Sequence, residues 1–207
     1  NAQARHELTA ATGDPLAQLR AIEEMRRGGA PKQALQSLDA LLTQYPRFAE
    51  GYLQRALIFA ANRGGVNREA ADTARQALAL GLREPSDAAL AQSLIAFQAL
   101  ERGDGATAQA AMDAALTPAP GYDPELLPDG QRAELHALRG QAYRRQGRYD
   151  DAYREVGLAL ALALAAGHND TVARLRQEQE IIEKHAGRKL SAAPLRSEPT
   201  FPSSDGR

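Results

Sequence analysis

Cysteine and tryptophan are absent from this 207-residue chain, and aromatic residues make up only 5% of it. Without cysteine, the chain can form no disulfide, no thiolate metal site and no cysteine nucleophile. Its longest apolar run, residues 156–166, is far shorter than the roughly 20 residues that cross a bilayer. The net charge of −1 gives no general reason to bind nucleic acid or an anionic membrane. We therefore expect a soluble protein with no membrane span and no nucleic-acid partner.

Patterns that carry chemistry are also missing. No histidine is spaced from another histidine or a carboxylate as in H-E-x-x-H, and no G-x-S-x-G elbow occurs. The glycines at 64–65 and 103–105 follow no strand and precede no G-K-[ST]. Asp150 and Asp151 are adjacent on an expected helix and so point apart. His136 suits a partly buried structural position. The sequence predicts no enzyme activity, no metal site and no cofactor.

The residues that are present favour a folded helical protein. Hydrophobic residues make up 43% and charged residues 25% of the chain, and alanine and leucine dominate. Arginine outnumbers lysine by 22 to three. A skewed genomic base composition explains this bias, and the alternative is that the arginines serve bidentate recognition of carboxylates.

Helix punctuation recurs along the chain. Asp14-Pro15 can begin a helix, Gly28-Gly29 can end it, Pro31 can begin the next and Tyr45-Pro46 can close it. Similar boundary residues, with apolar residues at helical spacing between them, recur along the rest of the chain. These patterns predict helices at 50–61, 68–80, 106–116, 131–146 and 149–166, and one from 85 toward Gly103 and Gly105.

Other segments frame these pairs. Residues 1–13 form a lead-in, and residues 117–130, with four prolines, predict an extended loop. Residues 167–187 predict a helix that is apolar on one side and charged elsewhere, as expected of a helix that caps an open stack. The tail at 188–207 has three prolines and four serines and is expected to be disordered or extended.

The clearest pair resembles the tetratricopeptide repeat (TPR) family. That family's 34-residue unit places small residues, an aromatic and a large apolar residue at fixed positions. The pair at 131–166 supplies them in order and at the same spacing: Gly140, Tyr143, Ala152, Val156 and Ala159. Small residues let helices approach closely, and the large ones fill the remaining gaps.

Three earlier pairs resemble the same unit less closely. Equivalent alanines at 34, 70, 108 and 152 are 36, 38 and 44 residues apart, and no pair has the family's tryptophan. The expected repeats are 15–48, 49–84, 85–120 and 131–166, within an array at 14–166. The resemblance implies an all-α, right-handed α-solenoid of about four repeats with a C-terminal capping helix. A general helical solenoid that only approximates the consensus is the alternative.

The resemblance also implies a concave groove lined by the first helix of each pair. Carried over by position, the candidate partner-binding residues are Leu19, Glu23, Arg26, Arg27, Leu53, Leu57, Leu90, Phe97, Leu100, Gln141, Arg144 and Arg145. Leu19 and Glu23 stand where some members grip a C-terminal carboxylate, so that clamp is absent. An apolar or amphipathic segment with acidic flanks would suit this groove. In a register shifted by one residue, some of these apolar residues would belong to the core.

The expected function is a non-catalytic protein-interaction scaffold or assembly factor that holds a partner segment in the groove. The alternative is a structural subunit of a larger complex that uses its convex face, the Pro-rich loop or the tail. A third hypothesis is an accessory domain of a larger enzyme or envelope machine. TPR proteins of this composition occur in bacterial cytoplasm and envelope alike. The start at Asn1, without Met, favours a periplasmic or envelope-associated location.

Overall fold

The computed structural model describes residues 13–62, 67–120 and 122–190, and this part of the chain is helical throughout, without a strand. Its α-helices are α2 (Pro15–Arg27), α3 (Pro31–Gln44), α4 (Ala49–Asn62), α5 (Arg68–Leu80), α6 (Pro85–Glu101), α7 (Gly105–Leu116), α8 (Asp129–Arg145), α9 (Tyr149–Ala165) and α10 (Asn169–Ala186). One 3₁₀ helix, η1 (Pro124–Leu126), lies between α7 and α8.

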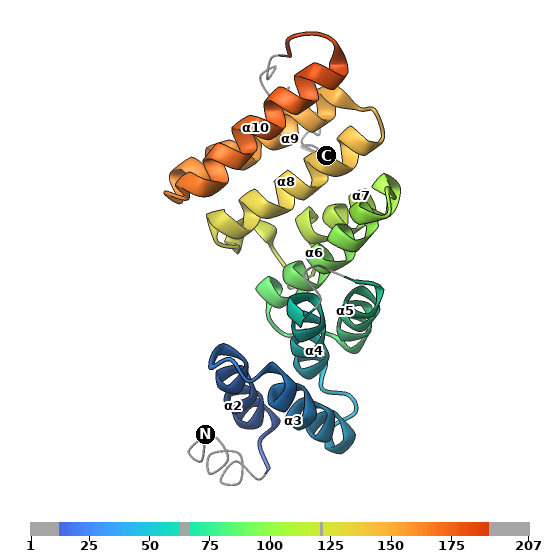
Figure 1. Cartoon of the computed structure of the whole chain (residues 1–207), viewed down its shortest axis with the longest axis vertical. Coiled ribbons are helices and arrows are strands. Elements are labelled where there is room, and N and C mark those ends of the chain that lie inside the picture. The colour runs from blue at the N-terminus through green and yellow to red at the C-terminus, as the bar shows by residue number, and fades with distance from the viewer. Residues whose placement is uncertain (1–12, 63–66, 121, 191–207) are drawn as a thin grey trace, which may run out of the picture.

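The helices stack as successive pairs, from α2 and α3 at one end to α8 and α9 toward the other, where α10 follows (Figure 1). Each helix packs mainly on its neighbours in sequence, and the first helices of successive pairs also touch, α2 with α4, α4 with α6 and α6 with α8. Each pair therefore buries its apolar face against the next. The expected all-α solenoid of about four pairs with a terminal helix is confirmed.

Local signals in the sequence explain where the helices begin and end. Asp14 accepts a hydrogen bond from the Leu16 backbone N–H at 2.9 Å, and Pro15 occupies the first helical position of α2. Asn67 caps α5 in the same way through the Ala70 N–H, at 2.8 Å. Gly147 turns the chain between α8 and α9 with φ of 75°. The expected Gly64-Gly65 turn falls outside the described residues.

Small residues form the contacts between helices. Ala34, Ala108 and Ala152, three of the equivalent alanines, are completely buried. Gly140 of α8 approaches α9 so closely that a Cβ atom built on it would lie 2.8 Å from the Val156 Cγ2 atom. Backbones this close require glycine or alanine at the crossing, which is the physical basis of the repeat pattern.

The Pro-rich segment that connects α7 to α8 contains the η1 turn and several local contacts. Pro124 and Leu127 are buried, and Ala119 and Tyr122 form an isolated antiparallel bridge. The Tyr122 hydroxyl donates to the Ala115 carbonyl at the end of α7. Proline prevents a long helix here but allows the η1 turn. The following helix begins at Asp129, two residues before the expected start.

Helix α10 covers the last pair. Leu175 and Ile182 are buried on its inner side. After Gly187 the chain still contacts the domain, because Arg188 pairs with Asp150 at 2.7 Å and Leu190 is buried. The start of the expected disordered or extended tail is thus part of the folded domain. Residues 191–207 and the lead-in at 1–12 lie outside the described residues.

Candidate functional site

The candidate groove face is formed by α2, α4, α6 and α8, whose successive contacts place them side by side. At the N-terminal end of this face lies a cavity of about 330 Å³. Its lining consists of Leu16, Leu19, Arg20 and Glu23 of α2, Glu50, Leu53 and Gln54 of α4, and Arg83, Glu84 and Asp87 around the start of α6. Three successive repeats therefore contribute to one cavity.

Three of the candidate groove residues, Leu19, Glu23 and Leu53, meet in this cavity. The repeat register did not assign Arg83, Glu84 and Asp87 to the groove, because these residues precede the positions of α6 that face the groove in the consensus repeat. The charged Arg83-Glu84 pair directly before the helix-starting Pro85 is the signal that could have identified them.

Polar contacts organise the cavity walls. The Arg83 Nε atom lies 3.2 Å from Glu50 Oε1, and the Glu50 side chain is only 10% exposed. Gln54 Nε2 donates to Glu23 Oε1 at 2.6 Å. Burial, together with the nearby carboxylates of Glu50, Glu84 and Glu23, raises the pKa of Asp87. The cavity is thus a site where negative charges already repel one another.

The apolar candidate residues in the middle of the face differ in burial: some belong to the core and others remain partly exposed. Leu53 and Leu100 are buried, with exposed fractions of 2% and 6%. Leu57, Leu90 and Phe97 pack against the same cluster but remain partly exposed. Among the candidate groove residues of α4 and α6, these three side chains are therefore the apolar ones that a bound segment could reach.

Two of the four arginines near the ends of the face, Arg27 and Arg144, have partners within the chain. Arg27 lies 2.7 Å from Glu24 and 3.8 Å from Glu23. Arg144 lies 2.7 Å from Glu178 of α10. Arg26 and Gln141 are partly buried, and Arg145 is exposed. Intramolecular carboxylates therefore balance the charge of Arg27 and Arg144, on which acidic flanks of a partner were expected to act.

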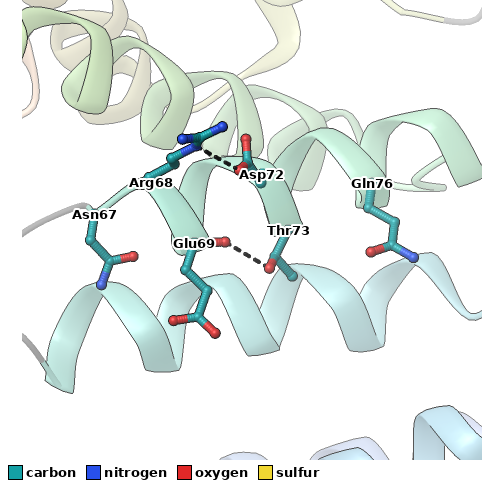
Figure 2. A pocket seen from close by; sticks show the side chains of 6 residues that line it. All are labelled: Asn67, Arg68, Glu69, Asp72, Thr73 and Gln76. Carbon is teal, nitrogen blue, oxygen red and sulfur yellow. Dashed lines mark hydrogen bonds and ion pairs between the residues drawn. The ribbon is translucent and has the colours of Figure 1, made fainter.

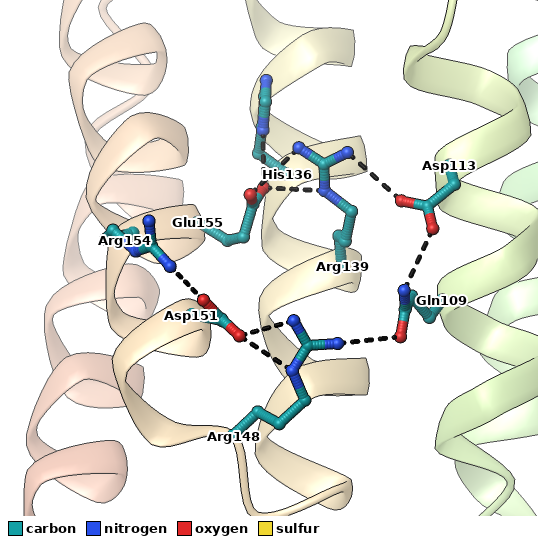
Figure 3. Close-up of polar contacts among 8 residues, drawn as sticks. All are labelled: Gln109, Asp113, His136, Arg139, Arg148, Asp151, Arg154 and Glu155. Carbon is teal, nitrogen blue, oxygen red and sulfur yellow. Dashed lines mark hydrogen bonds and ion pairs between the residues drawn. The ribbon is translucent and has the colours of Figure 1, made fainter. Parts of the chain in front are cut away.

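A second polar cluster joins α7, α8 and α9 away from the cavity (Figure 3). Arg139 donates to both carboxylate oxygens of Glu155, at 2.9 and 3.0 Å, and to Asp113 at 3.3 Å. His136 Nδ1 lies 2.9 Å from Glu155 Oε2. Burial raises the pKa of Glu155, but the hydrogen bonds from His136 and Arg139 outweigh it and leave this pKa below its ordinary value. The cluster holds helices together, and His136 occupies the partly buried structural position expected of it.

Aspartates at the start of α9 also pair with arginines. Asp151 accepts from Arg148 at 2.8 Å and from Arg154, and Arg148 reaches Gln109 of α7 at 3.4 Å (Figure 3). Asp150 pairs with Arg188. Each carboxylate therefore stabilises a helix end or a helix contact.

A hollow of about 490 Å³ lies beside α5 (Figure 2). The described residues that line it, from Asn67 to Gln76, all belong to α5 or its N-cap. Arg68 lies 3.5 Å from Asp72, and the Thr73 hydroxyl donates to the Glu69 carbonyl. Side chains on one helix do not converge on a ligand from several directions, so this hollow is not a candidate site.

Two further classes of site are not found in the part of the chain that the structure describes. No three histidine, aspartate or glutamate side chains there come together in a way that could hold a metal ion. Among the helices of the same residues, none has the length and apolar character needed to cross a membrane.

Neither a protein-family model nor a curated protein sequence matches this chain. The fold is similar to a structure of the APC/C hetero-tetramer Cut9-Hcn1, with TM-score 0.64, 20% identity and coverage of 88% of this chain and 33% of that chain. It is also similar to TTC0263, a thermophilic TPR protein of Thermus thermophilus, with TM-score 0.57, 20% identity and coverage of 84% and 86%. It is similar, too, to PilW, a widely conserved type IV pilus biogenesis factor, with TM-score 0.55, 17% identity and coverage of 84% of this chain and 86% of that chain.

These likenesses confirm, at the level of the fold, the TPR resemblance drawn from the sequence. The chain spans about a third of the length of the Cut9-Hcn1 chain that it matches. At such identities the comparison establishes the solenoid architecture alone.

Proposed function

We propose that this chain is a non-catalytic scaffold or assembly factor that holds a segment of another protein on the face of α2, α4, α6 and α8. The observation that carries the proposal is the cavity of about 330 Å³ to which three successive repeats contribute. Three further apolar side chains of α4 and α6, Leu57, Leu90 and Phe97, are partly exposed. A concave site with apolar surface and a few convergent polar groups is the usual form of a peptide-binding groove.

The comparisons support an assembly role without naming a partner. One similar fold is part of the APC/C hetero-tetramer Cut9-Hcn1, and another is a type IV pilus biogenesis factor. Both descriptions place a helical-repeat protein in the assembly of a larger structure. The PilW likeness also supports a bacterial envelope location, which fractionation of cells that carry the tagged full-length gene would test.

The groove can be tested with two substitutions and a matched control. Leu57→Asp and Phe97→Asp add charge to the partly exposed apolar face, whereas Leu164→Asp adds it to α9, where the side chain is 53% exposed. Circular dichroism melting establishes that each variant is folded. Quantitative affinity purification with mass spectrometry then compares the captured partners. We expect the groove variants to lose partners that the wild type and Leu164→Asp retain.

A second candidate function rests on Leu126, which is 80% exposed in η1 although it is a large apolar residue. Isolated exposed leucines are common, but this one belongs to the otherwise folded Pro-rich segment. A structural subunit that docks through this segment would lose its partners on Leu126→Asp and keep them on Leu57→Asp and Phe97→Asp. That result would replace the groove proposal.

A further inference from the structure

The cavity at the N-terminal end of the groove carries an excess of negative charge. Four carboxylates and two guanidinium groups line it: Glu23, Glu50, Glu84 and Asp87, and Arg20 and Arg83. The Glu50 side chain is 10% exposed, while its partner Arg83 is 63% exposed. An ion pair with one partner largely in water leaves the buried carboxylate poorly compensated.

The cavity also offers hydrogen-bond acceptors to a donor from outside. Glu23 is 24% exposed, its Oε1 accepts from Gln54 and its Oε2 lies 3.8 Å from Arg27. Each carboxylate oxygen has two lone pairs, so Glu23 can accept a further hydrogen bond. Burial and the neighbouring carboxylates of Glu50, Glu84 and Glu23 raise the pKa of Asp87, as expected where these negative charges lie close together. A positively charged group with several N–H donors would satisfy these acceptors and relieve the repulsion.

The shape of the cluster distinguishes among cations. In the described ranges, no three acidic or histidine side chains are close enough to hold one metal ion. A guanidinium or ammonium group at the end of a long side chain suits acceptors spread over three helices, because it presents several donors in different directions. The cavity volume of about 330 Å³ leaves room for such a side chain.

The neighbouring surface indicates what surrounds that side chain. Leu57 lies one helical turn beyond Leu53 on α4, and Leu90 lies three residues beyond Asp87 on α6. Both leucines are partly exposed and pack on the core cluster that contains Leu53. Acidic and apolar surfaces are therefore adjacent along the same two helices.

We propose that the segment held on this face carries an arginine or lysine whose side chain enters the cavity lined by Glu23, Glu50 and Asp87, with apolar residues of the segment over Leu57 and Leu90. This inference rests on the proposed groove function and specifies its partner. It replaces the expected acidic flanks with a basic residue, because Arg27 and Arg144 are paired with Glu24 and Glu178 within the chain.

A display library of random 12-residue peptides tests the inference without a known partner. The protein forms compared are the wild type, Glu50→Gln/Asp87→Asn, Glu84→Gln/Asp87→Asn, the groove variant Leu57→Asp/Phe97→Asp and a control, Glu69→Gln/Asp72→Asn. The control removes the same charge from exposed positions on α5. The second acidic variant leaves the buried Glu50 in place, so the test stands even where the first variant fails to fold.

We expect the wild type and the control to enrich peptides with arginine or lysine beside apolar residues. The acidic variants should lose the basic preference and keep the apolar one. An enriched peptide should bind the wild type about tenfold or more tightly than its citrulline-substituted form, because one partner of a partly buried charge pair is lost. In the acidic variants, the citrulline substitution should have little further effect.

Three outcomes would overturn the inference. Wild-type selections without a basic preference, or a basic preference that survives in both acidic variants, would exclude the cavity as its source. A dimer in sedimentation velocity that the acidic substitutions dissociate would make a second copy of this chain the occupant. Failure of the groove function itself looks different, since Leu57→Asp/Phe97→Asp would then enrich the same peptides as the wild type.

Discussion

Arg144 of α8 donates a hydrogen bond to Glu178 of α10, with 2.7 Å between the Arg144 Nε and Glu178 Oε1 atoms. The two side chains are 20% and 14% exposed, so much of each lies away from solvent. This pair attaches the terminal helix to the first helix of the last repeat. Arg144, which the repeat register assigns to the groove, therefore has a structural role within the chain.

The Arg144–Glu178 pair predicts a measurable coupling. Arg144→Ala and Glu178→Ala should each destabilise the protein, because each leaves a partly buried charge without its partner. Hydrogen bonds to charged groups contribute about 1.5–3 kcal/mol, so a coupling near the lower end of that range is expected for this partly exposed pair. Urea denaturation of the two single variants and the double variant gives the coupling energy. Additive effects of the two substitutions would contradict the pairing.

Glu155 predicts a specific dependence of stability on pH. The pKa of Glu155 is lowered in the folded state, so its contribution is complete above the unfolded pKa, near 4.5. That contribution is lost as pH falls from there through the lower folded pKa. Glu155→Gln should therefore be less stable than the wild type at pH 7, and the difference should narrow between pH 5 and 3. Urea denaturation at a series of pH values checks this, and a constant difference would exclude it.

Two helical glycines predict opposite effects of the same substitution. A Cβ on Gly140 would lie 2.8 Å from Val156 Cγ2, whereas a Cβ on Gly157 would meet only Gln179 Nε2, at 3.9 Å. Overpacking costs about 1–3 kcal/mol and alanine gains up to about 1 kcal/mol in helix propensity, so Gly140→Ala should destabilise the protein. Gly157→Ala should stabilise it by about 0.5–1 kcal/mol. Equal shifts of the thermal denaturation midpoint in the two variants would show that the close approach of α8 and α9 does not penalise a Cβ atom at position 140.

The helices were predictable because their signals are local. Asp14-Pro15, Pro31 and the glycine turns act within a few residues, and α5 spans Arg68–Leu80 as expected from the sequence. The core positions Ala152, Val156 and Ala159 of the fourth repeat follow from the repeat unit that this pair resembles, and all three are buried. Such patterns need no knowledge of how one pair is rotated against the next.

Polar partners depend on that rotation and were not predictable. Arg139 meets Glu155, 16 residues away, and Arg144 meets Glu178, 34 residues away, only after the helices have packed. The cavity likewise needs Asp87, which the consensus register does not assign to the groove. The folding of the Pro-rich segment depends on Pro124 and Leu127 reaching the core, which local proline content does not reveal.

Ile182 predicts how much the terminal helix contributes to the domain. Its side chain is completely buried between α10 and the last repeat, in a cluster with Val156 and Leu175. Ile182→Ala removes buried methyl and methylene groups and leaves a cavity, which costs about 2–5 kcal/mol in protein cores. Leu164→Ala is the matched control, because Leu164 lies on α9 but is 53% exposed and should cost less than about 0.5 kcal/mol. Denaturant unfolding measures both, and hydrogen exchange shows whether α10 opens before the earlier repeats. Equal losses for Ile182→Ala and Leu164→Ala would mean that α10 lies on the last repeat without closing its core.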